Sequence, residues 1–152
     1  MGAREQAVAK ILVELQCKTS YRRRLQALNK SVSNFDLNKD EFRNLRDKTV
    51  ELALSDKVFD VRKAAIAVCQ NNKLTKSGMP IALGKKFMPY KPNEITDVFL
   101  KIKRDNNMKE LNLKLFKEQF QLVNPEMFDV MSYEKKKLDA WIISIFTCLP
   151  NR

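Results

Sequence analysis

The sequence predicts an all-α protein of about six to eight helices, arranged as antiparallel hairpins that stack on one another. Apolar residues recur at three- and four-residue steps through most of the chain, which places them on one face of a helix. The 152 residues include only 3 glycines and 5 prolines, too few for the turns of a many-stranded sheet. A hydrophobic content of 44% supplies a core, and we expect a single helical domain over residues 1–152.

The first two predicted hairpins span residues 3–35 and 38–73. In the first hairpin, one apolar stripe contains Val8, Ile11, Leu12 and Leu15, and a second contains Tyr21, Leu25, Leu28 and Val32. On a helical wheel Arg23 and Lys30 point away from the second stripe, and Arg22 and Arg24 flank it. The basic run is therefore predicted to form a helix exterior.

The remaining chain is predicted to contain a basic loop, a third hairpin and a C-terminal segment. Residues 74–92 contain two of the three glycines and little periodicity, which indicates a long loop or one short helical turn. The third hairpin spans 93–124, and its second helix has apolar residues on nearly every side, a pattern typical of burial on several faces. Asn124-Pro125 opens the final segment, 125–149, which forms one helix or two.

Positive charge is concentrated in two stretches. The net charge is +11, and five basic residues with no acid lie between Lys18 and Lys30, with four more between Lys76 and Lys91. Such clusters favour a polyanionic partner, because lysine and arginine neutralise phosphates and release condensed counterions. A solvated helix surface is the alternative interpretation.

These stretches give the candidate residues for binding nucleic acid or an acidic protein surface: Arg22, Arg23, Arg24, Lys30, Lys85, Lys86 and Lys91. The loop Lys85–Lys91 also interleaves lysines with Phe87 and Tyr90, an arrangement that can combine phosphate contact with base stacking. Alternatively, Phe87 and Met88 pin the loop to the core. The sequence leaves both interpretations open.

The composition argues against common catalytic and metal sites. The chain has no histidine, which excludes zinc sites of the usual Cys/His kinds, Ser-His-Asp triads and Cys-His dyads within it. Its three cysteines are far apart, lie within or beside apolar helical patterns and are expected to be buried free thiols in a reducing compartment. No apolar run approaches the ~20 residues of a membrane span. We therefore expect a soluble, intracellular protein without cofactor or metal, nuclear or cytoplasmic, with the nucleus favoured.

One segment carries a more specific motif. In Leu54–Ala65 an aspartate, Asp56, is followed five residues later by Val61-Arg62 and then by Ala65. This spacing resembles the signature of the HEAT-repeat family. In that signature the aspartate accepts backbone donors at the start of a helix, the valine enters the core, and the arginine reaches a turn in the neighbouring repeat. These four residues are the predicted repeat-stabilising set.

Other parts of the chain match the motif less well. Placing Tyr21-Arg22 over Val61-Arg62 gives an offset of 40 residues, near the ~40–47 of HEAT units, but Gln16 then replaces the aspartate. A third unit on Leu111 has Asn106 at the aspartate position and Asn112 at the arginine position. The resemblance implies a curved α-solenoid whose faces bind proteins or nucleic acid.

Three functions are consistent with these observations. The first is a non-catalytic HEAT-type scaffold with a basic face for nucleic acid, chromatin or an acidic protein, by analogy with the HEAT subunits of condensin- and cohesin-type machines. The second is a pure protein–protein adaptor within a larger complex. The third is a HEAT-like alkylpurine DNA glycosylase, a family that uses a catalytic aspartate and an aromatic-lined groove. The single tryptophan, Trp141, lies within an apolar stripe and is predicted to be core, so we expect no enzyme activity.

Overall fold

The computed structural model describes residues 2–150 and contains two compact units, Met1–Phe87 and Met88–Arg152. Eight α-helices account for most of the described residues, which confirms the all-α prediction. The predicted single domain over 1–152 differs from this division. Residues 82–88, which run across the boundary between the units, are all exposed, as is typical of a segment that joins compact units.

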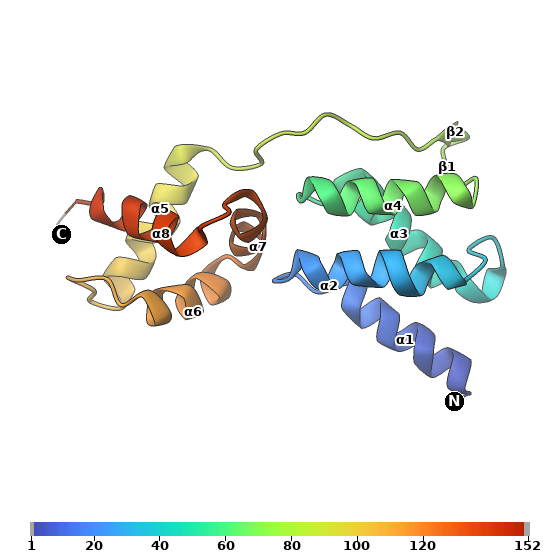
Figure 1. Ribbon diagram of the computed structural model, residues 1–152, viewed down its shortest axis with the longest axis horizontal. Coiled ribbons are helices and arrows are strands. Elements are labelled where there is room, and N and C mark those ends of the chain that lie inside the picture. Colours follow the sequence, from blue (N-terminus) through green and yellow to red (C-terminus); the bar gives the residue numbers. More distant parts are fainter. Residues whose placement is uncertain (1, 151–152) are drawn as a thin grey trace. The chain divides into compact units, whose positions relative to one another are not determined.

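The first unit contains two helical hairpins that pack against each other. In the first hairpin α2 continues into a π-helical turn and a 3₁₀ turn, and another 3₁₀ turn precedes α3. Figure 1 shows α2 and α4 side by side, and α1 likewise packs against α3. The elements are α1 (Ala3–Leu15), α2 (Tyr21–Gln26), the π turn (Ala27–Ser31), the 3₁₀ turns (Val32–Asn34 and Asp40–Phe42), α3 (Arg43–Ser55) and α4 (Phe59–Asn71).

The core of this unit is aliphatic and lies between the hairpins. Because each helix places residues three and four apart on one face, each hairpin contributes an apolar stripe to the interface. The residues with no exposed surface include Leu15, Leu28, Val32, Leu37, Leu45, Val58, Val61 and Ala65.

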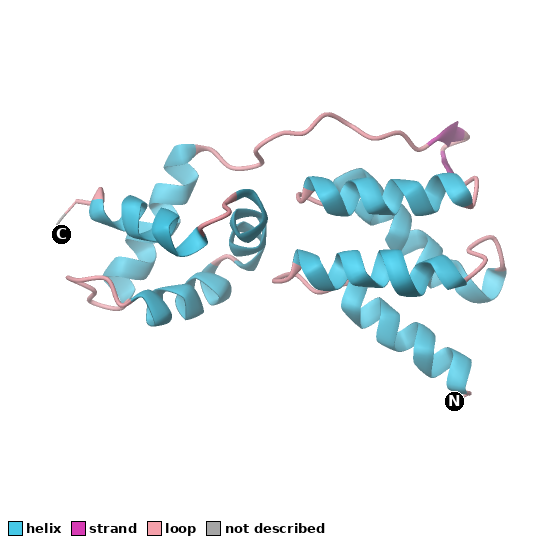
Figure 2. Ribbon diagram, viewed as in Figure 1, coloured by secondary structure: helices cyan, strands magenta, loops and turns pink. Residues whose placement is uncertain are grey.

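A small β-hairpin follows α4, where the sequence analysis predicts a loop or a short helical turn. Strands β1 (Thr75–Lys76) and β2 (Met79–Pro80) pair antiparallel, as the magenta segment of Figure 2 shows. Ser77 and Gly78 form the connection with φ of 53° and 79°. A two-residue turn with both φ positive has the backbone twist that antiparallel strands require. Residues 81–91 then continue without helix or strand.

The second unit consists of four helices around an aromatic cluster. They are α5 (Pro92–Asp105), α6 (Leu113–Val123), α7 (Pro125–Glu134) and α8 (Leu138–Thr147), so the C-terminal segment forms two helices. Phe99 is fully buried, and its ring centroid lies 4.7 Å from that of Phe116, 5.4 Å from Phe120 and 5.5 Å from Trp141. Trp141 is half-buried against this cluster.

Helix α6 packs against the other three helices of its unit, but one side of it is uncovered. Phe116 and Phe120 are fully buried, whereas Leu122 is 75% exposed. The prediction that this helix is buried on several faces is therefore wrong on the side of Leu122.

Local sequence signals explain where the helices of this unit begin. Pro92 and Pro125 occupy the first positions of α5 and α7, where the missing N–H costs no hydrogen bond. The Asn124 side chain accepts a hydrogen bond from the Met127 N–H at 3.0 Å and so caps α7. Within residues 2–150, none of the helices combines the length and the apolar character needed to cross a membrane.

Replacing Phe99 with alanine should lower the free energy of unfolding by about 3–5 kcal/mol, because a fully buried ring in contact with three others leaves a cavity. Urea denaturation followed by circular dichroism measures the change. The control is Leu122→Ala on the exposed side of α6, which should change stability by no more than about 0.5 kcal/mol. Equal losses in the two variants would contradict the assignment of Phe99 to the core.

The three free cysteines should differ in thiol reactivity. Burial raises the pKa of the Cys69 thiol from 9.0 to about 11, so only about one molecule in a thousand carries its thiolate at pH 8. Cys148 is exposed and Cys17 is half-buried, so the prediction that the three thiols are buried is confirmed for Cys69 and wrong for the other two. In a native titration with an aromatic disulfide reagent, Cys69 should react only on unfolding. A rapidly reacting thiol in the Cys17→Ser/Cys148→Ser variant would contradict this expectation.

Candidate basic binding surface

Most of the excess positive charge belongs to the first unit. Residues 1–87 contain 18 basic and 9 acidic residues, a net charge of +9, whereas residues 88–152 contain 11 basic and 9 acidic residues. A surface for a polyanion is therefore sought on the first unit.

The centre of this unit's charge arrangement is a buried ion pair between Arg24 and Asp56. Arg24 Nε donates to Asp56 Oδ2 at 2.9 Å and Nη2 donates to Oδ1 at 3.2 Å, and both side chains are 6% exposed. Asp56 Oδ1 also accepts the Val58 N–H at 2.8 Å, at the start of α4. One carboxylate thus fixes the α3–α4 turn and links it to α2 of the preceding hairpin.

Arg24 is therefore not part of a solvent-facing surface, and the sequence prediction for this residue is wrong. The predicted apolar stripe marks the buried face only in part. Leu28 and Val32 are fully buried, but Tyr21 and Leu25 are half-buried, and Arg24 is buried instead of lying on the exterior. Arg24 also donates to the Cys17 carbonyl at 2.7 Å, so its guanidinium is satisfied in the interior.

The equivalent residue of the second hairpin is Arg62, which also corrects the alignment of the hairpins. Arg62 Nη1 donates to the Asp56 carbonyl at 2.7 Å, just as Arg24 donates to its own turn. The sequences Arg24-x-x-Ala27 and Arg62-x-x-Ala65 match at an offset of 38 residues, and all four residues are buried. The offset of 40, which places Arg22 at this position, is thus wrong; Arg22 is exposed, with its guanidinium 5.3 Å from the Tyr21 ring centroid.

Arg62 also holds the segment after the β-hairpin, residues 81–87, which we call the strap. Its Nη2 donates to the Lys85 carbonyl at 3.5 Å, and its guanidinium lies 4.8 Å from the centroid of the Phe87 ring. Figure 1 shows the chain running back from β2 along α4. Phe87 therefore pins the strap to the first turn of α4, although its side chain stays 54% exposed.

These contacts bring parts of the two basic stretches to the same end of the first unit. The start of α2 is joined to the α3–α4 turn through Asp56, and the start of α4 is joined to the strap through Arg62. Four of the predicted binding residues lie at this end with exposed positions: Arg22, Arg23, Lys85 and Lys86.

A groove between α1 and the second helix of the first hairpin extends this basic region. It is open, has a volume of about 650 Å³, and is lined by Arg23 and Lys30 together with Lys10 and Glu14. Arg23 Nε lies 3.9 Å from Glu14 Oε2, which partly neutralises it. Lys10 was not among the predicted residues. The sequence does carry a signal for it. In two antiparallel helices, residues at equal distances from the connecting turn lie opposite each other. Lys10 therefore faces Gln26, which lies between Arg23 and Lys30 in the sequence.

The other predicted residues have separate locations. Lys91 belongs to the second unit, where it precedes α5 as the N-cap residue. Val61 and Ala65 are fully buried, and Arg62 is 4% exposed, so these three residues of the motif lie inside the first unit.

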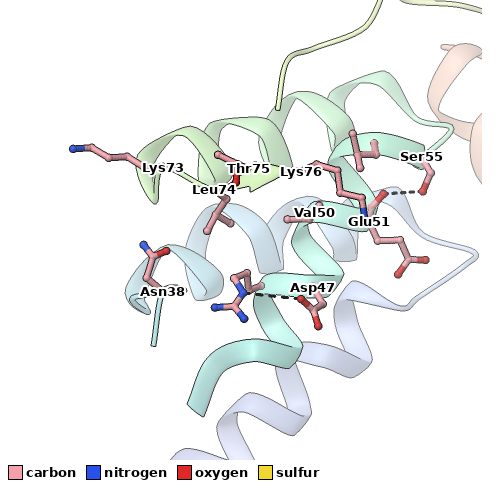
Figure 3. A pocket seen from close by; sticks show the side chains of 11 residues that line it. Asn38, Asp47, Val50, Glu51, Ser55, Lys73, Leu74, Thr75 and Lys76 are labelled. Atoms are coloured by element: carbon pink, nitrogen blue, oxygen red, sulfur yellow. Dashed lines mark hydrogen bonds and ion pairs between the residues drawn. The ribbon is translucent and has the colours of Figure 1, made fainter. Parts of the chain in front are cut away.

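A second open groove lies between α3 and the β-hairpin, and Figure 3 shows its lining. Asp47, Val50 and Glu51 project from α3, and Lys73 and Lys76 come from the segment after α4. Acidic and basic side chains alternate here, and Arg46 pairs with Asp47 at 4.0 Å. This mixture of charges does not suit a polyanion.

Three carboxylates of the first unit have structural roles. Glu41 lies 3.4 Å from Arg4, Asp56 is paired with Arg24, and Asp60 is in the first turn of α4, where the helix dipole favours negative charge. Among the described residues, histidine, cysteine and acidic side chains form no group of three that could hold a metal ion.

Comparisons with protein-family models, curated proteins and solved structures give no match.

Replacing Arg24 with alanine should lower the free energy of unfolding by about 3–5 kcal/mol, because it leaves the Asp56 carboxylate buried without its counter-charge. Asp56→Asn should also destabilise, since it keeps an acceptor for Val58 but removes the charge. The matched control is Arg22→Ala, two residues away and exposed, with an expected change within about 0.5 kcal/mol. Equal unfolding midpoints of the Arg24 and Arg22 variants in urea would contradict the buried role of Arg24.

Proposed function

We propose that this protein is a non-catalytic binding and scaffold module whose first unit binds nucleic acid through its phosphates. The residues that make the contacts are Arg22, Arg23, Lys30, Lys85 and Lys86, with Lys10 added from α1. Chromatin-associated nucleic acid in the nucleus is the favoured setting.

The observation that carries this proposal is the meeting of two basic segments at one end of a unit with a net charge of +9. The side chains of Arg22 and Arg23 at the start of α2, and of Lys85 and Lys86 on the strap, are exposed. Arg22 and Arg23 lie on a helix, so they can bind phosphate without the entropy cost of ordering a flexible tail. Counterion release then gives binding that is strong at low salt and independent of sequence.

We further propose that the two hairpins of the first unit are HEAT-like repeats. The support is the use of one aspartate, Asp56, both to start α4 and to receive Arg24 from the preceding hairpin. Repeats joined in this way leave their outer faces available for binding.

A protein–protein adaptor is the second candidate, and the groove between α3 and the β-hairpin favours it. Leu54 is 49% exposed in this groove, and Met79 on the neighbouring strand is 68% exposed. Apolar side chains beside charges of both signs are typical of protein interfaces. The glycosylase alternative is not favoured, because the single tryptophan packs edge-on against Phe99 and belongs to the second unit, which has 11 basic and 9 acidic residues.

Salt dependence of binding to a fluorescent duplex of about 20 bp tests the proposed function. Fluorescence anisotropy should give an affinity that falls with salt, with a slope of about −0.9 for each phosphate contact. Replacing Arg22, Arg23, Lys85 and Lys86 together by alanine should reduce the slope by about 3 to 4.

The matched control removes the same amount of charge from the second unit, through alanine at the exposed residues Lys109, Lys114, Lys136 and Lys137. This variant should keep most of the affinity and slope. Equal losses in both variants would show that net charge alone attracts the duplex. A wild-type affinity weaker than ~10⁻⁴ M at low salt would exclude nucleic-acid binding.

A further inference from the structure

Two arginines of the first unit occupy equivalent positions, but their surroundings differ in charge. Arg24 and Arg62 are 5% and 4% exposed, and each donates at 2.7 Å to a carbonyl in the turn of its own hairpin. Arg24 also forms an ion pair with the carboxylate of Asp56, which belongs to the next hairpin. The contacts of Arg62 are instead with neutral groups: the carbonyls of Asp56 and Lys85 and the rings of Phe59 and Phe87.

Arg62 is thus a buried cation for which residues 2–150 provide no ion-pair partner. A buried charge is costly unless an opposite charge compensates it. Arg62 Nη2 has one long bond, to the Lys85 carbonyl at 3.5 Å, so a carboxylate that reached it would form the stronger, charge-assisted contact.

The group that covers Arg62 is weakly held. The Lys85 carbonyl is 3.5 Å from Nη2, at the limit of a hydrogen bond, and the Phe87 side chain is 54% exposed. All six residues from Ala82 to Phe87 are exposed, so displacing them uncovers Arg62 without opening the core.

We propose that Arg62 is a docking site for an aspartate or glutamate on a helical turn of a partner protein, and that strap residues Lys85–Phe87 cover this site in the free chain. The Arg24–Asp56 contact is the template for this interaction, since it joins an equivalent arginine to an acidic turn. Exposed Lys63, Lys85 and Lys86 beside the site favour an acidic partner. The site shares Lys85 and Lys86 with the proposed phosphate contacts, but the role assigned to Arg62 does not depend on nucleic-acid binding.

The probe for this docking site is a synthetic peptide with the sequence of residues 50–61, which contains the Asp56 turn, and its Asp56→Asn form is the control. With full-length protein, Phe87→Ala should bind the acidic peptide several-fold more tightly than the wild type, because the cover is loosened. The Asp56→Asn peptide should bind about tenfold more weakly. Arg62→Gln should remove the difference between the two peptides.

A second measurement requires neither a peptide nor the loss of Arg62. Phe87→Glu places a carboxylate beside the guanidinium, and Phe87→Gln is its neutral control. The glutamate variant should unfold at a Tm higher by about 4–8 °C, and Arg62→Gln in the same background should remove this shift.

Equal Tm values for Phe87→Glu and Phe87→Gln, or equal binding of the two peptides to Phe87→Ala up to 1 mM, would overturn the proposal. So would tighter binding of a DNA duplex to Phe87→Ala than to the wild type with no preference for the acidic peptide, because the site would then take phosphate. The duplex titration of the four-residue alanine variant decides the proposed function separately.

Discussion

The Arg24–Asp56 ion pair is the interaction on which the first unit depends. Asp56 orders the turn before α4 through the Val58 N–H and holds α2 through Arg24. Its main-chain carbonyl accepts from Arg62, which in turn holds the strap. Since a buried charge without its partner costs several kcal/mol, the pair acts as a constraint on how the two hairpins meet. The positions of α2, α4 and the strap therefore follow from the same turn.

This constraint separates the basic residues into buried and exposed ones. Of the three consecutive arginines Arg22–Arg24, the last is buried in the ion pair with Asp56 and the first two remain exposed. The strap lysines are exposed because Arg62 binds the strap through a main-chain carbonyl and a ring and leaves the ammonium groups outside. Arg22 and Arg23 stand on a helix, which distinguishes this part of the cationic surface from a solvated basic tail.

Much of the helical architecture could be predicted from sequence, because it depends on local signals. The apolar spacing of α3, α4 and α5 and the Asn124-Pro125 start of α7 act within one or two turns. Arg24 could not be predicted, since a helical wheel treats arginine as exterior and its carboxylate lies 32 residues away. The exposure of Leu122 and the division into two units likewise depend on packing between distant segments. The Ser77-Gly78 dipeptide is a sequence signal for a hairpin turn. The two strands beside it are only two residues long, however, and are too short to show the alternating pattern that predicts a strand.

The strap connects the two proposed binding events, and thermodynamics fixes their relation. Lys85 and Phe87 are two residues apart, so a partner that displaces Phe87 from Arg62 also displaces Lys85 and Lys86, for which we propose phosphate contacts. If an acidic partner changes the affinity for nucleic acid by a certain factor, then nucleic acid must change the affinity for that partner by the same factor. Because a released strap loses the preorganisation that α4 gives it, we expect this coupling to be negative. A strap that takes part in both contacts would thus let the module exchange one ligand for the other.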